Sequence, residues 1–382
     1  MPVLTAVVLT LWGCAAHHKQ SSFVQPAPLR VQDPAFLRSL DNFGSIMVKG
    51  NDGRILENGD GVFPAMLKDI AQAKSSVALE TFIYKSDEVG RMFADAMIQA
   101  SRRGVQVRLL ADAQGSSLDD LRKELLAGGV MVKDYRPAPS HSYFGRRTHR
   151  KLLIIDGRIG YTGGFCIDKR WLGGARNKDE WHDSTVRVTG PVVSQMQAIF
   201  GEDWTYTTGE ILAGEVFFPK LDPTGSMFAQ AIKASKGDAS SFPKMLYFMA
   251  IEASRNSIHI QNPYFLPDSQ IRAALIAAAQ RGVEVRVMVP GRNIDMPPVR
   301  MASRANFGEL LQGGVKIYEY QPTMIHTKTM IVDGLWSVVG SSNFDYRSFG
   351  INDEVNVATR DAAIAQPLAE DFAADLSVSR LQ

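Results

Sequence analysis

The chain contains the same set of short motifs twice, in the same order, and this duplication restricts its fold more than any other feature. Three segments recur: RGVQVR and RGVEVR at 103–108 and 281–286, LLAGGV and LLQGGV at 125–130 and 310–315, and THRK and IHTK at 148–151 and 325–328. With 382 residues in the chain, each copy is long enough to bury a hydrophobic core of its own. We expect two similar halves to pack about a pseudo-twofold axis, which brings equivalent residues from both halves to a shared interface.

Each copy alternates helical and extended patterns. Ala-rich helical segments end at Gly104 and Gly282, as expected for a glycine in the left-handed position that closes a helix. The continuous apolar runs at 152–155 and 329–332 are typical of buried strands. The pattern predicts an α/β fold of two pseudo-twofold-related halves, each a mixed β-sheet flanked by helices, with an active site at their interface.

We expect the chain to divide into three parts. Residues 1–40 are predicted to form a signal segment and a flexible tether, residues 41–215 the first half, and residues 216–382 the second. The boundary between the halves is placed where Gly, Pro, Ser and Lys accumulate, between Thr207 and Ser241.

The start of the chain resembles a bacterial lipoprotein signal. An apolar run of about ten residues, too short to span a bilayer, ends in Leu11-Trp12-Gly13-Cys14. In such a signal the peptide is cut before the cysteine, whose thiol is then acylated, although the basic residues that usually precede the apolar run are missing here. This predicts lipidation at Cys14 and a membrane-associated protein that faces the periplasm or the cell exterior. The alternative is a cytoplasmic, peripheral membrane protein in which Cys14 is incidental.

The repeated motif places a histidine and a lysine two residues apart, with an aspartate five residues further on. The two sets are His149, Lys151 and Asp156 in the first copy, and His326, Lys328 and Asp333 in the second. On a strand the histidine and lysine point to the same face, because side chains alternate with a period of two. Asp156 and Asp333 come after four apolar residues, and we expect them to anchor a loop or an interface and not to carry protons.

Two histidines and two lysines that converge at an interface suit a phosphodiester. One imidazole can attack phosphorus and form a phosphohistidine, while the other protonates the leaving oxygen and then activates the incoming alcohol or water. The lysines, with Asn343 and Ser341, supply donors to the non-bridging oxygens, and Gly164 lets the backbone approach the phosphate. We expect Asp183 to orient His149 and Glu354 to orient His326, because each carboxylate follows its histidine within the same copy.

No Cys/His cluster or carboxylate array has metal-ligand spacing, so we expect neither a metal nor another cofactor. The net charge is only +2, which disfavours nucleic acid as a partner.

The two motifs resemble those of the phospholipase D superfamily over about residues 45–380. Further strings resemble bacterial cardiolipin synthases: ETFIYKSD at 80–87, WHD at 181–183, VTGP at 188–191, NPYFLPD at 262–268 and NFDYRS at 343–348. The resemblance implies transfer of a phosphatidyl group between phospholipids without a metal, most simply onto the hydroxyl of phosphatidylglycerol, with His149 as nucleophile and His326 as acid and base. Two departures stand out: Cys166 replaces a usual asparagine, and the usual pair of N-terminal membrane helices is missing.

Three other functions stay open. A hydrolytic phospholipase D differs only in admitting water; Tyr143, Phe144, Phe265 and Met324 are the apolar residues expected to exclude it. A phospholipase D-type nuclease is disfavoured by the near-neutral charge. A non-catalytic binding lipoprotein is disfavoured because both His–Lys pairs are intact. The expected partners are phospholipid substrates and a membrane surface, and a monomer suffices because both halves of the site lie in one chain.

Overall fold

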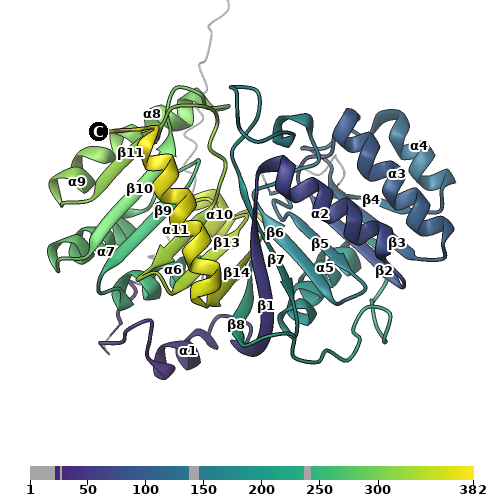
Figure 1. The fold of residues 1–382 in the computed structure, drawn as a ribbon, viewed down its shortest axis with the longest axis horizontal. Coiled ribbons are helices and arrows are strands. Elements are labelled where there is room, and N and C mark those ends of the chain that lie inside the picture. Colours follow the sequence, from purple (N-terminus) through teal and green to yellow (C-terminus); the bar gives the residue numbers. More distant parts are fainter. Residues whose placement is uncertain (1–21, 26–27, 137–145, 236–241) are drawn as a thin grey trace, which may run out of the picture.

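A computed structural model describes residues 22–25, 28–136, 146–235 and 242–382. Its strands form one sheet of fifteen in the order β15-β11-β10-β9-β12-β13-β14-β8-β1-β7-β6-β5-β2-β3-β4. The order is a mirror-image repeat: strands β1 to β7 of the first half have the equivalents β8 to β14 in the second, and β15 adds an edge. The strands that join the halves are β1 (Val48–Glu57) and β8 (Met227–Ala234), which pair antiparallel. The predicted pair of related halves is therefore present (Figure 1).

The other strands follow the same plan in both halves. In the first half they are β2 (Ser76–Thr81), β3 (Gln106–Asp112), β4 (Met131–Tyr135), β5 (Leu152–Ile155), β6 (Ile159–Gly163) and β7 (Ser184–Thr189). In the second half they are β9 (Ser257–Gln261), β10 (Glu284–Pro290), β11 (Lys316–Tyr320), β12 (Thr329–Val332), β13 (Trp336–Gly340), β14 (Glu354–Arg360) and β15 (Ser379–Leu381). In each half three strands pair parallel and the rest antiparallel, so each half carries the predicted mixed sheet.

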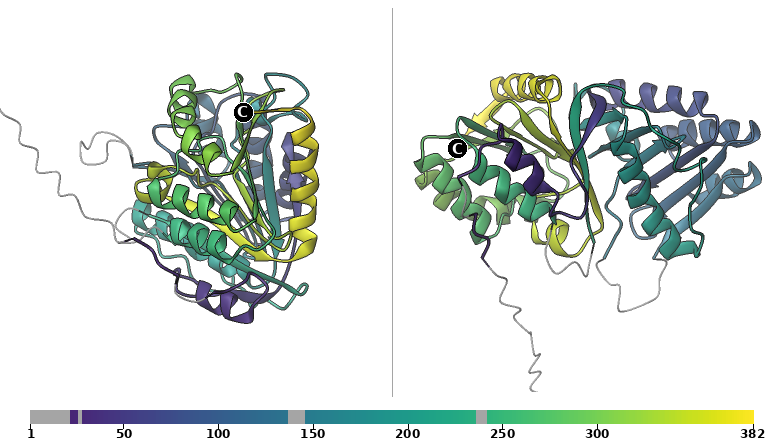
Figure 2. Two further views of the ribbon diagram at one scale, coloured as in Figure 1. Left: turned by 90° about the vertical axis from the view of Figure 1, so that its left-hand side faces the viewer. Right: turned by 90° about the horizontal axis from the view of Figure 1, so that it is seen from below.

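Helices cover the outer faces of the two halves. Those of the first half are α2 (Asn58–Gln72), α3 (Glu88–Arg102), α4 (Asp119–Ala127), the short 3-10 helix η2 (Lys169–Trp171) and α5 (Val192–Thr208). Those of the second half are α6 (Phe242–Ala253), α7 (Ser269–Gln280), α8 (Pro297–Ala305), α9 (Phe307–Gln312), α10 (Tyr346–Gly350) and α11 (Ala362–Ser377). Gly104 and Gly282, just past α3 and α7, have φ of +90° and +91°, as the sequence predicted. Figure 2 shows the two halves side by side, with α2 and α3 over the first and α11 over the second.

Where the halves meet, β6 contacts β13 and β14, and β7 contacts β13. A hydrophobic core lies at this junction, and it includes side chains from both sheets, such as Ile154, Val186, Ile331 and Val355. The segments that carry the repeated His–Lys pairs run into β5 and β12 on either side of the junction. The fold therefore places both pairs at one interface.

The expected tether of residues 1–40 is wrong in its last part. Helix α1 (Pro34–Leu40) packs on the core of the second half, where Phe36 and Leu40 are fully buried. The Phe36 ring meets Trp336 edge to face at 6.2 Å. Apolar side chains three and four residues apart give this segment a core-facing side, which a flexible tether lacks.

Cys14, Tyr143 and Phe144 lie outside the described residues. Within the described ranges, no helix combines the length and the apolar character that crossing a bilayer would require. The boundary expected at residue 215 falls between α5 and β8.

Candidate active site

Each His–Lys segment is hydrogen-bonded to the opposite half of the molecule. The His149 backbone N–H donates to the carbonyl of Asp353 at 2.8 Å, and the His326 N–H donates to that of His182 at 2.7 Å. Asp353 immediately precedes β14, and His182 lies just before β7. The two halves therefore exchange backbone contacts at the site, and each fixes the position of the other's histidine.

The histidines are oriented by carboxylates from the opposite half, which corrects the pairing expected from the sequence. His149 Nδ1 lies 3.0 Å from Glu354 Oε2, and His326 Nδ1 lies 2.9 Å from Asp183 Oδ2. The expectation that Asp183 orients His149 and Glu354 orients His326 is therefore wrong. Because β7 and β14 begin at the interface, the carboxylate at the start of each strand reaches across it.

Both carboxylates are held by further donors. Glu354 accepts hydrogen bonds from the hydroxyls of Ser341 and Ser348, the latter at 2.7 Å. Asp183 accepts from the indole N–H of Trp171 at 2.8 Å and from the backbone N–H of Ser184 at 2.9 Å. Each carboxylate keeps one position relative to its imidazole, as an orienting group requires.

The two lysines are buried beside the histidines and differ in what they contact. Lys151 Nζ donates to the carbonyl of its own His149 at 2.7 Å. Lys328 Nζ donates to the carbonyl of His326 at 2.5 Å and also lies 3.0 Å from each ring nitrogen of that histidine. The second imidazole thus has a cation against its ring, whereas no such contact is recorded between Lys151 and the ring of His149 in the described part of the chain.

Burial shifts the pKa values of these groups. It lowers the pKa of His149 to about 4, and it lowers that of His326 well below its usual value, with Lys328 adding to the effect. The pKa of Lys328 falls to about 7 for the same reason, and that of Asp183 rises to about 6. For Glu354, burial raises the pKa, but His149, Lys151 and the hydroxyl of Ser341 together outweigh burial, and the net shift is downward. Both imidazoles are therefore neutral in the free protein at neutral pH.

Asp156 and Asp333 lie away from the cavity and anchor loops. Asp156 accepts the backbone N–H groups of residues 74, 75 and 76, at 2.9, 2.7 and 2.9 Å. Asp333 accepts those of residues 255, 256 and 257, at 3.0, 2.7 and 3.0 Å. Both have φ of +53°, which places the carboxylate at the turn that follows its strand. These contacts agree with the expected anchoring role.

A cavity of about 590 Å³ opens onto the two imidazoles. Its walls include the charged or polar residues His149, Lys151, Cys166, His326, Asn343, Arg147, Arg170, Arg347, Asp295, Asp345 and Asn352, and the largely apolar residues Phe82, Ile83, Trp171, Trp181, Tyr264, Leu266, Met296, Val299 and Tyr346. A lining that combines basic and apolar side chains suits an amphiphile with a phosphate head.

The supporting residues predicted from the sequence play different parts. Asn343 lines the cavity, and its buried Oδ1 has no hydrogen-bond partner among the described residues, so its side chain is placed to meet a ligand. Ser341 was expected to donate to phosphate, but its hydroxyl donates to Glu354. A Cβ on Gly164 would come within 2.4 Å of Asp183 Oδ2, so its small size makes room for that carboxylate. Phe265 and Met324 were expected at the mouth but are buried in hydrophobic cores.

Sequence reasoning missed several residues that line the site. Phe82, Trp171 and Trp181 pack on the reacting groups: Phe82 lies 5.2 Å from the ring of His149, and Trp171 and Trp181 lie 5.1 and 5.2 Å from that of His326. Phe82, Trp181 and Arg347 fall inside the strings that resemble cardiolipin synthases, so their position in those strings was a usable signal. Arg147 lies in none of these strings.

Within the described residues, one buried group, His182 with Asp371 and Asp375, has ligand atoms close enough together to hold a metal ion. His182 Nε2 lies 2.9 Å from Asp375 Oδ2. Although burial lowers the pKa of His182, the two carboxylates raise it well above its ordinary value. His182, just before β7, and the two aspartates of α11 thus form a buried ion-pair cluster between the halves.

Two His–Lys pairs, each held by a carboxylate from the opposite half of a duplicated α/β fold, define a phosphodiester-transfer site of the phospholipase D type. The family model described as "Cardiolipin synthase, PLD-like domain" matches residues 66–204 and 247–376, and the chain belongs to this family.

The curated relatives include two proteins of Bacillus subtilis (strain 168). The chain is 37% identical over 333 residues to "Probable cardiolipin synthase YwiE", and this match covers 85% of the chain and 66% of the relative. It is 34% identical over 369 residues to "Major cardiolipin synthase ClsA", and this match covers 95% of the chain and 76% of the relative. The chain therefore spans about two thirds to three quarters of these relatives' length.

A solved structure, the phosphatidylserine synthase of Haemophilus influenzae Rd KW20, shares the fold with a TM-score of 0.70 at 13% identity, over 91% of this chain and 92% of that one.

Proposed function

We propose that the chain transfers a phosphatidyl group from one phospholipid to the hydroxyl of another through a phosphohistidine, and that its product is cardiolipin. The observation that carries this proposal is the crossed arrangement of the two histidines, in which Glu354 and Asp183 each hold one Nδ1. With Nδ1–H donated to the carboxylate, the other ring nitrogen keeps its lone pair free for attack or proton transfer. The relatives' names supply the product.

The first half-reaction breaks the donor's phosphodiester. Nε2 of neutral His149 attacks phosphorus, the P–N bond forms, and the P–O bond to the leaving alcohol breaks. His326 gives its proton to the departing oxygen. The pKa of His326 is low in the free protein, but a bound phosphodiester anion adds a negative charge beside the ring and raises it. Lys151 and Lys328 offset the charge on the non-bridging oxygens, with Asn343 as a further donor.

The second half-reaction makes the new phosphodiester. His326, now neutral, takes the proton of the acceptor hydroxyl, the new P–O bond forms as the P–N bond breaks, and both imidazoles return to their starting state. Water in place of the lipid hydroxyl would give phosphatidic acid. Transfer therefore depends on the acceptor lipid occupying the cavity before water reaches the phosphohistidine.

Membrane association is part of the proposal. The exposed side chains of Met296 and Tyr346, 47% and 77% accessible, stand at the mouth of the cavity, where a lipid surface would cover them. We also propose that Cys14 carries the lipid anchor, that the protein faces the periplasm or cell exterior, that it acts as a monomer, and that nucleic acid is not a substrate.

The test is an assay on mixed vesicles of phosphatidylglycerol and phosphatidylethanolamine in excess EDTA, with the lipid products resolved by mass. We expect cardiolipin to form, and to disappear with His149→Ala. Phosphatidic acid as the main product at saturating phosphatidylglycerol would favour a hydrolytic phospholipase D. Loss of turnover in EDTA, with recovery on adding one metal, would contradict a reaction that rests on Lys151 and Lys328 alone.

A further inference from the structure

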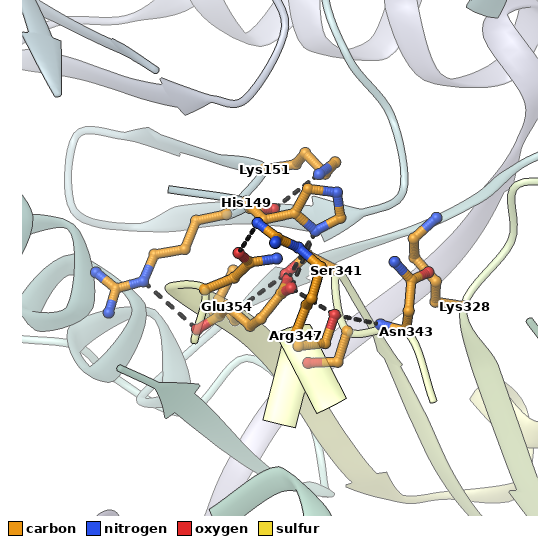
Figure 3. Close-up of polar contacts among 12 residues, drawn as sticks. His149, Lys151, Lys328, Ser341, Asn343, Arg347 and Glu354 are labelled. Carbon is orange, nitrogen blue, oxygen red and sulfur yellow. Dashed lines mark hydrogen bonds and ion pairs between the residues drawn. The ribbon is translucent and has the colours of Figure 1, made fainter. Parts of the chain in front are cut away.

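Two arginines from opposite halves line the cavity, and the reaction described above uses neither. Arg147 lies two residues before His149, in the segment that leads into β5. Arg347 extends from α10 into the same cavity (Figure 3). Its guanidinium is 3.5 Å from Asn352 Oδ1 at the closest atoms.

Arg147 is placed next to the reacting groups through a shared aromatic ring. Its guanidinium lies 5.3 Å from the centre of the Phe82 ring, which also lies 5.2 Å from the ring of His149 and 5.5 Å from Lys151 Nζ. Its Nε is buried, and no described residue forms a hydrogen bond with it. The adjacent Arg146 forms an ion pair with Asp353 at 3.0 Å, whereas in the described part of the chain no carboxylate does so with Arg147.

The surroundings of Arg147 favour an anion. Burial lowers its pKa, and the positive charge of Arg347 lowers it further, against a smaller opposite effect of Asp112, so the two guanidiniums repel each other in a partly desolvated cavity. Two carboxylates also line the cavity: Asp345 accepts the N–H of Ser348 at 2.8 Å, and Asp295 accepts the hydroxyl of Tyr264 at 2.7 Å. An anion between the arginines would relieve this repulsion.

The reacting phosphate has its own cations in Lys151 and Lys328, so a second anion in the cavity would meet the positive charges of Arg147 and Arg347. An acceptor such as phosphatidylglycerol carries one, because its attacking hydroxyl and its own phosphodiester are joined by a single glycerol. We propose that Arg147 and Arg347 bind the phosphodiester of the acceptor lipid and hold its hydroxyl at the phosphohistidine. The inference rests on the proposed function. A guanidinium suits this role because its paired N–H groups match two phosphate oxygens.

The test compares an acceptor that carries a phosphate with one that does not. Phosphatidylethanolamine vesicles serve as the donor, and phosphatidylglycerol or free glycerol as the acceptor. Arg147→Gln should lower kcat/KM for phosphatidylglycerol by about 10- to 100-fold, the loss expected for a charged hydrogen bond, and change transfer to glycerol by less than about twofold. Arg147→Lys should recover part of the loss, since it restores the charge but not the paired donors. Arg102→Gln, an exposed change on α3, controls for the charge of the protein at an anionic membrane.

The outcomes separate this inference from the function on which it rests. Wild-type protein that makes neither product defeats the proposed function. Wild-type protein that makes both, together with Arg147→Gln that lowers both equally or neither, leaves the function standing and overturns the acceptor site.

Direct binding gives a second readout. The probes are glycerophosphoglycerol, the head group without its acyl chains, and inorganic phosphate, both measured by calorimetry. Arg147→Gln should weaken the binding of glycerophosphoglycerol by about tenfold, and Arg102→Gln should leave its affinity unchanged. Inorganic phosphate that binds as tightly as the diester, and loses as much with Arg147→Gln, would assign the pair to free phosphate and overturn the proposal.

Discussion

Glu354 of the second half holds the imidazole of His149 in the first, with 3.0 Å between Oε2 and Nδ1. The reciprocal contact joins Asp183 to His326 at 2.9 Å. Each half thus supplies a histidine and the carboxylate that orients the other half's histidine. Neither half contains a complete pair by itself, and the site exists only where the two are packed together.

Replacing Glu354 by glutamine should leave the fold in place and lower kcat by roughly 10²- to 10⁴-fold, in the range known for the orienting carboxylate of a catalytic triad. The amide can present its N–H₂ to Nδ1 and so favour the tautomer with the proton on Nε2, which removes the attacking lone pair. Steady-state kinetics with a thermal unfolding curve measure both effects. Glu370→Gln, on the exposed side of α11, is the matched control.

The crossed pairing predicts which histidine each carboxylate affects. If the pairing were within each half, Glu354→Gln would impair His326 and would spare formation of the covalent intermediate on His149 from a donor whose leaving group needs no proton. A Glu354→Gln protein that still forms the intermediate at the wild-type rate would contradict the contact seen here.

The pH profile should be displaced from that of free imidazole. With the pKa of His149 at about 4, attack stays possible well below pH ~6.5, and the acidic limb of kcat/KM should fall near pH 4 to 5. Lys328, with a pKa of about 7, loses its proton as the pH rises through 7, so the alkaline limb should begin there. Both limbs are measured in the rate profile of the free enzyme. An acidic limb near pH 6.5 would contradict a lowered pKa of His149.

The free energy of unfolding should also depend on pH through the lowered pKa values of His149 and His326. Between pH ~6.5 and 4 the unfolded chain takes up protons on residues 149 and 326 that the folded protein does not, so these two histidines lower the free energy of unfolding as the pH falls. Asp183, with its pKa raised to about 6, acts in the opposite direction, so the contribution of His149 is the difference in slope between the wild type and His149→Ala. Denaturant unfolding at several pH values measures the slope.

Asp156→Asn should destabilise the protein without changing the chemistry. The carboxylate accepts three consecutive backbone N–H groups, and an amide can serve at most part of that role, so we expect a loss of about 1–3 kcal/mol in the free energy of unfolding. The value of kcat for the protein that remains folded should change by less than about twofold. We expect the same loss of stability and the same unchanged kcat for Asp333→Asn. A large drop in kcat with unchanged stability would place Asp156 in the reaction.

The sequence predicted the fold because the duplication, the helix-closing glycines and the buried strand patterns are local signals. The same holds for His149, Lys151, His326 and Lys328, which are marked by their spacing. The partner of each histidine could not be predicted this way. Asp183 and Glu354 were both recognised, but spacing along the chain favours a partner in the same half, and the exchange depends on how β7 and β14 cross the interface.

Other parts of the site also depend on packing. The sequence predicted Ser341 near the site, but it could not predict which group the hydroxyl contacts. In the folded protein the hydroxyl lies within hydrogen-bond distance of Glu354 and donates to it. Arg147 has no equivalent in the second half and no partner at a fixed spacing, so only the cavity identifies it. Helix α1 was assigned to a tether because seven residues carry too little periodicity to separate a docked helix from a loop.

Cys14→Ser should release the protein from membranes. The Leu-x-Gly-Cys ending predicts that the mature chain starts at an acylated Cys14, and two or more acyl chains anchor a protein stably. Fractionation and the mass of the N-terminal peptide measure the change, and Cys166→Ser, at a buried position, serves as the comparison. If Cys14→Ser alters neither, the protein is held at the membrane by other means or is not held there.

The two histidines should differ in which one carries the covalent intermediate. Lys328 Nζ lies 3.0 Å from both ring nitrogens of His326, which weakens that ring as a nucleophile and places a proton donor beside it. Lys151 instead donates to the backbone carbonyl of His149. We therefore expect His149 to attack and His326 to move protons. His149→Ala should abolish both turnover and covalent labelling by a radiolabelled phospholipid. His326→Ala should stop turnover but still trap label from a donor whose leaving group needs no proton. Peptide mapping of the quenched intermediate decides the matter, since label on His326, with His149→Ala still labelled, would exchange the two roles and leave the reaction class unchanged.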